Sequence, residues 1–140
     1  MDVIKLRDEL QRDEGWRQWA YHDSEGVLTI GYGRNIDPSG PGLSREEALY
    51  LLDNDITRVC RQLDMHIVWW RTLDDARARA LANMAFCLGV AGLQRFSMML
   101  AALHAGDWNT AAAEALDSKW ARQVGDRAKR IAEIFRTGAE

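Results

Sequence analysis

Three side chains near the start of the chain have types and a spacing that suit the hydrolysis of a glycosidic bond. Glu14 and Asp23 supply carboxyl groups, and Thr29 supplies a hydroxyl a few residues further along. Enzymes that cut glycosidic bonds commonly use one carboxyl group as an acid and a second as a base or nucleophile. A hydroxyl beside them can hold a water molecule. These three residues are therefore the first candidates for acid–base chemistry.

Glu14 falls at the end of a predicted helix. Val3, Leu6 and Leu10 recur at helical spacing, and Glu14 follows Leu10 by four residues on the same apolar face. Gly15 is typical of a helix C-terminus. Apolar surroundings and the negative end of the helix dipole both favour the protonated form that a general acid needs. A solvated glutamate at a fraying helix end fits the spacing equally well.

A turn and a short strand place Asp23 and Thr29. The segment Asp-Ser-Glu-Gly that starts at Asp23 fits a type I turn, in which aspartate more often caps its own backbone than performs catalysis. In the strand that follows, Thr29 alternates with Leu28 and Ile30, so its side chain points to the opposite face. If that face borders a cleft, the hydroxyl can hold water. Otherwise Thr29 is an ordinary strand threonine.

The order of motifs along nearly the whole chain resembles that of the phage-type lysozymes, glycoside hydrolase family 24, which include the endolysins of T-even phages. The segments that carry the resemblance are residues 13–15, 21–26, 28–33, 83–86 and 88–89, then Gly92 and Phe96, then 126–130 and 135–138. Each short motif is weak by itself, and their combination in matching order is specific.

The resemblance implies an α+β, mainly helical, lysozyme-like fold. A small N-terminal β-hairpin lobe and a larger helical lobe around a central buried helix are expected. Residues 1–140 would form a single domain, with the small lobe at about 15–43. The helical body would comprise residues 44–140 together with the N-terminal helix.

The resemblance also implies roles for individual residues. Glu14 would be the general acid, Asp23 the second carboxylate, and Thr29 would help to position the attacking water. Sugar contacts are expected near Gly33 and Phe86. Arg127 would approach Glu14 and hold its orientation.

The chain departs from the family pattern at Arg34, where many members carry histidine. In those members the histidine pairs with an aspartate that would fall at Asp55 here. Arginine can keep such a pair but does not titrate in the working range. We therefore expect an ion pair between Arg34 and Asp55. The stretch between Gly33 and Leu43 is short, so the small lobe should be minimal.

Local signals outline the rest of the chain. Residues 44–47 form a capping box, Ser-Arg-Glu-Glu, at the start of a predicted helix. A nearly apolar run at residues 76–88 predicts a central helix buried on all sides. Asn83 lies within this run, where an unpaired amide would cost roughly 1–3 kcal/mol, so it needs a hydrogen-bond partner.

Six tryptophans, at positions 16, 19, 69, 70, 108 and 120, could stack on sugar rings. Tryptophan at helical spacing more often belongs to the core. Trp16 and Trp19 are the two whose role stays open, because they lie between the candidate carboxylates.

Composition excludes several classes of function. The net charge is −3, and no nucleic-acid-binding motif is present, so nucleic acid is not an expected partner. The three histidines are scattered without metal-ligand spacing, so neither a metal nor another cofactor is expected. A serine nucleophile elbow is also lacking. The basic side chains of residues 122–136 suit a solvated helix face, or contact with anionic wall polymers or lipid headgroups.

The residues and the resemblance together predict a muramidase. It would cleave the β-1,4 bond between N-acetylmuramic acid and N-acetylglucosamine in the glycan strands of peptidoglycan and cause bacterial lysis. The alternatives are a non-catalytic wall- or protein-binding module on the same fold, and a membrane-active protein that works through its basic C-terminal helix. Glu14→Gln separates them, because only the enzyme needs this carboxyl group.

The absence of a signal-peptide-like apolar run or a membrane-spanning stretch predicts synthesis in the host cytoplasm without stable membrane insertion. As an endolysin, the protein would depend on a membrane-permeabilising holin to reach the periplasm and the wall. A monomer is expected.

Overall fold

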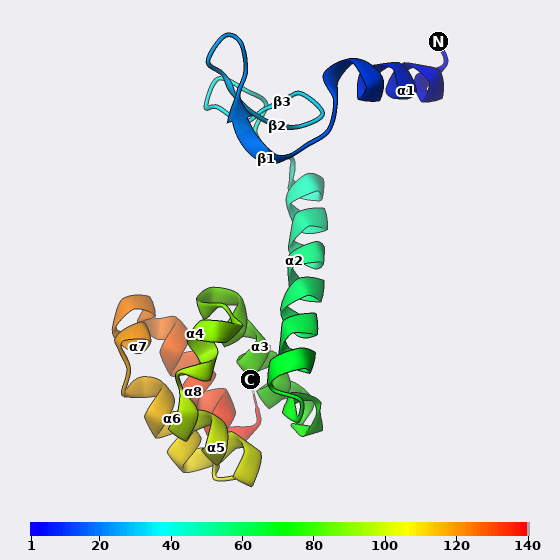
Figure 1. Ribbon diagram of the computed structural model, residues 1–140. Helices are drawn as coiled ribbons and strands as arrows, with labels where there is room; N and C mark the ends of the chain where they lie inside the picture. The colour runs from blue at the N-terminus through cyan, green and yellow to red at the C-terminus, as the bar shows by residue number, and fades with distance from the viewer. Residues whose placement is uncertain (140) are drawn as a thin grey trace. The chain divides into compact units, whose positions relative to one another are not determined.

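The computed structural model describes residues 1–139 as two compact units, one of residues 1–49 and the other beginning at Tyr50 (Figure 1). The first contains α1 (Val3–Glu14), β1 (Arg17–His22), β2 (Leu28–Gly31) and β3 (Arg34–Asn35), and α2 (Arg45–His66) begins in it. The second contains the short 3-10 helix η1 (Trp70–Thr72), α3 (Asp75–Leu88), α4 (Val90–Gln94), α5 (Ser97–Ala105), α6 (Trp108–Leu116), α7 (Lys119–Val124) and α8 (Asp126–Thr137). The expected mainly helical α+β fold with a small sheet is confirmed. Within residues 1–139, no helix is both long and apolar enough to cross a membrane.

Helix α1 ends where the sequence predicts, and Asp2 caps its start. The carboxylate of Asp2 accepts hydrogen bonds from the backbone N–H groups of Ile4 and Lys5, at 3.0 and 3.1 Å, and so caps the first turn. Gly15 ends the helix with φ at +70°, and its N–H donates to the carbonyl of Gln11. A positive φ of this kind favours glycine over any residue with a side chain.

The three strands form an antiparallel sheet in the order β1-β2-β3 (Figure 1). Thr29 in the middle strand lies opposite Tyr21 on β1 and Asn35 on β3, so these three residues share one face of the sheet. The register of β1 against β2 is irregular between Arg17 and Tyr21. The sheet therefore places Thr29 at its centre, while part of β1 lies outside the regular ladder.

The predicted capping box at the start of α2 is present. The N–H of Glu47 donates to Oγ of Ser44 at 3.1 Å, and the N–H of Ser44 donates to Oε2 of Glu47 at 2.8 Å. The same carboxylate also accepts hydrogen bonds from the two terminal nitrogens of Arg34, at 2.6 and 3.1 Å. Glu47 thus ties the strand region to the first turn of α2.

Glu47 makes stability depend on pH. The hydrogen bond from Arg34, followed by that from the Ser44 backbone, lowers the pKa of Glu47 from 4.5 to about 2. The folded state therefore prefers the ionised form, and the stabilisation is fully present above about pH 4.5 and fades as the pH falls toward 2. We expect Glu47→Gln to lower the melting temperature at pH 7 and to match the wild type near pH 2.

Thermal unfolding followed by circular dichroism at pH 7, 5, 3 and 2 measures this effect. Glu46→Gln is the matched control, because it removes a neighbouring exposed carboxylate from the same helical turn. The melting temperature of Glu46→Gln should change with pH in the same way as that of the wild type. Equal melting temperatures for Glu47→Gln and wild type at pH 7 would show that the Arg34–Glu47 pair contributes nothing.

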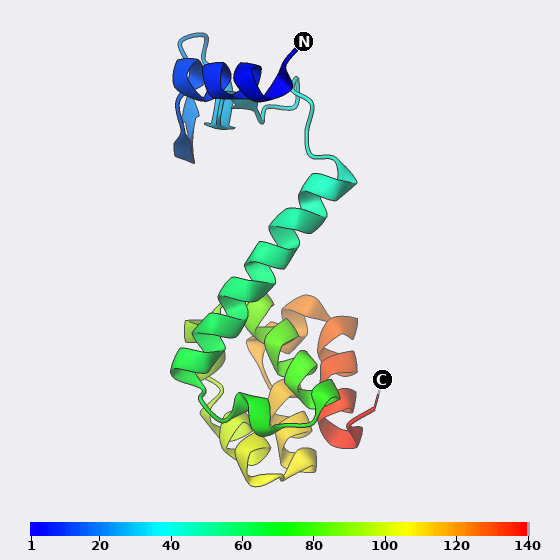
Figure 2. The same cartoon turned by 90° about the vertical axis from the view of Figure 1, so that its right-hand side faces the viewer.

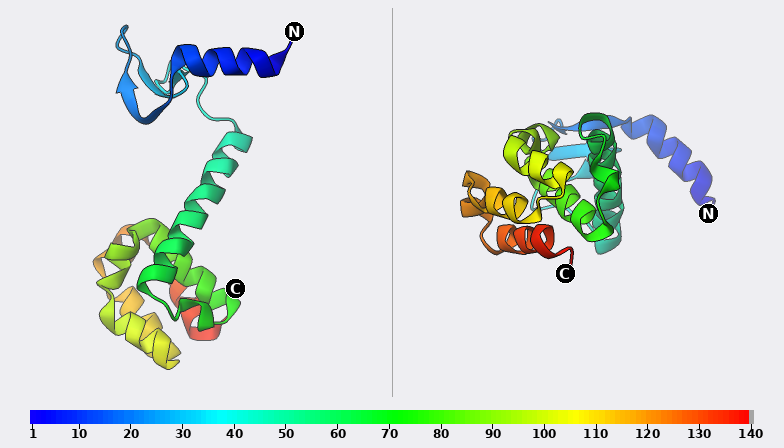
Figure 3. Two further views of the ribbon diagram at one scale, coloured as in Figure 1. Left: turned by 45° about the vertical axis from the view of Figure 1, so that its right-hand side comes forward. Right: turned by 90° about the horizontal axis from the view of Figure 1, so that it is seen from below.

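The second unit is built around a core to which α3 contributes five buried residues. Figures 2 and 3 show its helices gathered together, with the red α8 among them. Helix α6 packs against both α5 and α8, and α3 packs against α8 and α4. The largest fully buried side chains are Leu63, Leu81, Met84, Leu93, Met99, Leu103 and Phe135. The apolar run at 76–88 is confirmed as a core helix, but it is not buried on every side, since Asn83, Phe86 and Cys87 are exposed.

Arg77 on α3 is the one charged residue among the buried residues of the described chain. Its Nε donates to the carbonyl of Phe135 at 2.7 Å, and one terminal nitrogen donates to the carbonyl of Arg136 at 3.2 Å. The other terminal nitrogen donates to Asp74 at 2.7 Å, and the guanidinium lies 3.9 Å from the centre of the Trp108 ring. Arg77 therefore satisfies carbonyls at the end of α8 that the helix itself leaves unpaired.

Candidate functional site

The carboxyl group of Glu14 lies against the backbone of Gly33. A Cβ atom added to Gly33 would come within 2.7 Å of Oε2 and 3.0 Å of Cδ of Glu14. Gly33 also has φ at +73°, which disfavours a side chain for a separate reason. Glu14 and Gly33, which the family resemblance assigns to the site, therefore lie side by side. A larger residue at position 33 would displace the carboxyl group of Glu14.

Glu14 is an exposed residue of α1, and no residue of this helix is buried. Within residues 1–49 its side chain forms no hydrogen bond or ion pair. The expectation that an apolar environment desolvates Glu14 is therefore not supported within this unit. Exposure leaves the carboxyl group accessible to a ligand.

Asp23 has the predicted turn-capping role. Its Oδ1 accepts hydrogen bonds from the backbone N–H groups of Glu25 and Val27, both at 2.9 Å. The N–H of Gly26 donates to the Asp23 carbonyl at 3.0 Å and closes the turn. Both bonds to the carboxylate use the same oxygen. The side chain is therefore held in a fixed orientation while Oδ2 receives no bond from residues 1–49.

Thr29 is 4% exposed, and its hydroxyl donates to the carbonyl of Val27 at 2.9 Å. The N–H of the same Val27 donates to Asp23. The backbone N–H and carbonyl of Val27 therefore fix the side chains of Asp23 and Thr29, respectively. Because the hydroxyl proton is committed to Val27, the oxygen of Thr29 has lone pairs left to accept a hydrogen bond from water.

Asp37 supports the same strand and was not identified from the sequence. Its Oδ2 accepts from the N–H of Leu28 at 2.7 Å, and its own N–H donates to the side chain of Asn35 at 2.9 Å. The only local signal was an aspartate directly before Pro38 in a loop. Asp37 lies in the loop after β3, and its bond to Leu28 fixes this loop against the start of β2, next to Val27.

Arg34 has a partner in the first unit that the sequence did not predict. Arg34 pairs with Glu47, and the Arg34 guanidinium also donates to the carbonyl of Gly42 at 3.0 Å. Asp55 pairs with Arg58, which is three residues further along the same helix. The capping box holds the carboxylate of Glu47 at the N-terminus of α2. A pair between Arg34 and Asp55 would join the two units and stays a prediction.

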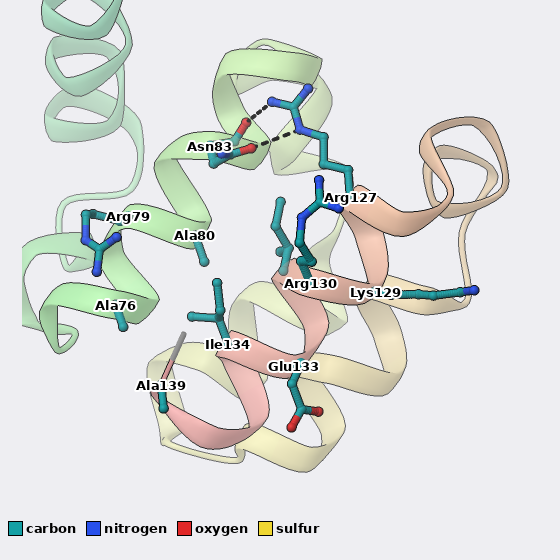
Figure 4. A pocket seen from close by; sticks show the side chains of 11 residues that line it. Ala76, Arg79, Ala80, Asn83, Arg127, Lys129, Arg130, Glu133, Ile134 and Ala139 are labelled. Atoms are coloured by element: carbon teal, nitrogen blue, oxygen red, sulfur yellow. Dashed lines mark hydrogen bonds between the residues drawn. The ribbon is translucent and has the colours of Figure 1, made fainter.

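In the second unit, Asn83 has the hydrogen-bond partner that its position requires. Nε of Arg127 donates to the side-chain oxygen of Asn83 at 2.9 Å, and a terminal nitrogen of Arg127 donates to the Asn83 carbonyl at 3.1 Å (Figure 4). Both residues line a cavity of about 620 Å³, shown in Figure 4, and a second of about 800 Å³ that Phe86 also lines. Phe86 is 43% exposed, so its ring is accessible. The expected approach of Arg127 to Glu14 stays a prediction.

Comparison with known proteins gives a consistent family. The model of the phage lysozyme family matches residues 11–136. The chain is 33% identical over 96% of its length to the pre-baseplate central spike protein Gp5 of Enterobacteria phage T4, and it spans 28% of the length of that protein. Probable T4-type lysozymes 2 and 1 of Dictyostelium discoideum are 28% and 26% identical, each over 97% of this chain and 96% of the relative. The chain belongs to the phage lysozyme family.

Proposed function

We propose that the protein is a peptidoglycan hydrolase of the muramidase type, which cleaves the β-1,4 bond between N-acetylmuramic acid and N-acetylglucosamine. The observation that carries the proposal is the shared anchoring of Asp23 and Thr29 on Val27, in the same compact unit as Glu14 and Gly33. One exposed carboxyl group, a second that is held in orientation, and a hydroxyl with free lone pairs are the groups that this hydrolysis requires. The probable T4-type lysozymes among the relatives support the same activity.

In this mechanism Glu14 donates its proton to the glycosidic oxygen as the bond to the sugar breaks. Thr29 accepts a hydrogen bond from a water molecule, and Asp23 acts as base or electrostatic partner for that water. The water oxygen bonds to the anomeric carbon, and its proton leaves toward the carboxylate. Gly33 leaves bare backbone beside Glu14, where a sugar ring can approach. Phe86 offers an accessible ring as a further sugar contact. No step requires a cofactor.

We place the action of the enzyme at the cell wall. As an endolysin it would be made in the host cytoplasm and reach the periplasm with the help of a holin, as a monomer and without stable membrane insertion. The bacterial glycan strand is then the substrate that it binds. The match to a segment of a phage spike protein supports a second setting, in which the same domain acts on the wall as part of a larger assembly.

The chemical identity of the product tests the proposed bond. Purified Gram-negative sacculi are digested with the protein, the new reducing ends are reduced with borohydride, and the resulting sugar alcohols are identified. A muramidase yields reduced N-acetylmuramic acid. Reduced N-acetylglucosamine would instead indicate cleavage of the other glycosidic bond, and a 1,6-anhydro product would exclude water as the nucleophile. Sacculi that bind the protein and remain intact would indicate the non-catalytic module.

A further inference from the structure

Two of the six tryptophans lie at the surface of the first unit. Trp19 is 75% exposed and Trp16 is 64% exposed, whereas Trp70 and Trp120 are 6% and 4% exposed in the core of the second unit. An indole ring left in water forfeits roughly 1.5–3 kcal/mol that burial of a large apolar side chain would yield. Solvent exposure of two large aromatic side chains within one short segment of the chain is typical of a surface that binds a partner.

The irregular part of β1 determines how Trp19 is presented. The strand register shifts between Arg17 and Tyr21, and Trp19 lies at the middle of that segment. The guanidinium of Arg17 stacks over the Tyr21 ring at 4.9 Å, so these two flanking side chains contact each other. Irregularities of this kind re-aim a side chain out of the ladder. Trp19 thus extends from β1 with most of its side chain exposed to solvent.

The position of β1 links these tryptophans to the candidate site. The strand begins shortly after Glu14 and ends directly before Asp23, so both carboxyl groups and both tryptophans belong to one short segment. A glycan strand is long compared with the single bond that is cleaved. It can therefore touch protein surface beyond the two carboxyl groups.

Charge favours a glycan over a lipid surface as the occupant. Residues 1–49 contain ten acidic and six basic side chains, a net charge of −4. Exposed tryptophans also occur at membrane interfaces, but there they act with basic residues that meet anionic headgroups. An acidic unit is repelled by such headgroups. The C–H groups on the face of a pyranose ring pack against an indole ring without requiring a positive charge.

We propose that Trp19, with Trp16 as a second contact, is a stacking platform for a sugar ring of the peptidoglycan glycan strand. The proposal rests on the muramidase function and adds a substrate-binding surface outside the pair of carboxyl groups. Trp19 binds and positions the strand and takes no part in proton transfer. Its loss should therefore raise KM and leave kcat unchanged.

Sedimentation with purified sacculi measures binding directly. The parent protein carries Glu14→Gln, which prevents digestion during the assay. Trp19→Ala and Trp19→Gln in this background should weaken binding by roughly three- to tenfold, the loss expected for one aromatic stacking contact. Trp19→Tyr keeps an aromatic ring and should retain most of the affinity. Tyr50→Ala is the matched control, because Tyr50 is 69% exposed and lies in the other unit.

Unchanged binding by Trp19→Ala and Trp19→Gln would overturn the proposal. A loss that Trp19→Tyr does not restore would overturn stacking as its cause. Vesicles of phosphatidylethanolamine and phosphatidylglycerol provide the alternative surface, and a loss confined to vesicle binding would assign Trp19 to a membrane. Failure of the wild-type protein to release fragments from the same sacculi would instead refute the proposed function. The two failures are therefore distinguishable, because one is read from binding and the other from fragment release.

Discussion

Glu14→Gln should lower the lytic rate by about 10²–10⁴-fold, the contribution typical of a positioned general acid. An amide has nearly the shape of the carboxyl group but has no proton to donate to the leaving oxygen. The fold should be retained, because Glu14 is exposed and forms no hydrogen bond or ion pair within residues 1–49. Turbidity loss of permeabilised Gram-negative cells measures the rate, and circular dichroism verifies that the variant is folded.

Glu9→Gln is the matched control for this prediction. Glu9 is an exposed glutamate on the same helix α1, so the substitution removes the same charge from the same element. Its lytic rate should stay close to that of the wild type. If folded Glu14→Gln retains most of the wild-type rate, Glu14 is not the general acid, and the proposed mechanism must be abandoned.

Arg77→Met should cause the largest loss of stability, about 2–4 kcal/mol. Methionine fills a similar volume, but it leaves the carbonyls of Phe135 and Arg136 without their buried donors and removes the cation from the face of Trp108. For a chain of this size, a loss of that magnitude lowers the melting temperature by roughly 6–12 °C. Thermal and urea unfolding at neutral pH measure it.

Arg136→Met provides the comparison within the same helix. Arg136 pairs with Glu133 at the surface, and its side chain is 52% exposed. Exposed ion pairs contribute about 0–1 kcal/mol, so this variant should remain close to the wild type. Equal destabilisation by the two substitutions would show that burial of Arg77 confers no special stability.

Several features follow from the sequence because they depend on residues close to one another along the chain. The end of α1 at Gly15, the turn closed by Asp23 and the capping box of Ser44 and Glu47 all involve partners within four residues. Backbone geometry alone then decides the contact. The motif order further identified the family, and the matching family model confirms it.

Other features depended on which distant groups the fold brings together. The sequence suggested only Asp55 as a partner for Arg34, and spacing could not show that Glu47 also pairs with this guanidinium. Arg77 looked like an ordinary arginine at the start of an apolar helix. Only the packing of α3 against α8 reveals that the guanidinium of Arg77 caps the end of α8.

By itself, the sequence determined the family, the mainly helical α+β class and the three candidate residues of the site. The tertiary structure alone decided how those residues are held. Val27 links Asp23 to Thr29, Gly33 lies against Glu14, and α1 leaves Glu14 exposed rather than desolvated. The physical reason is that residue type and local spacing set which conformations a segment prefers. Hydrogen bonds between segments and the exposure of a side chain arise only when those segments pack.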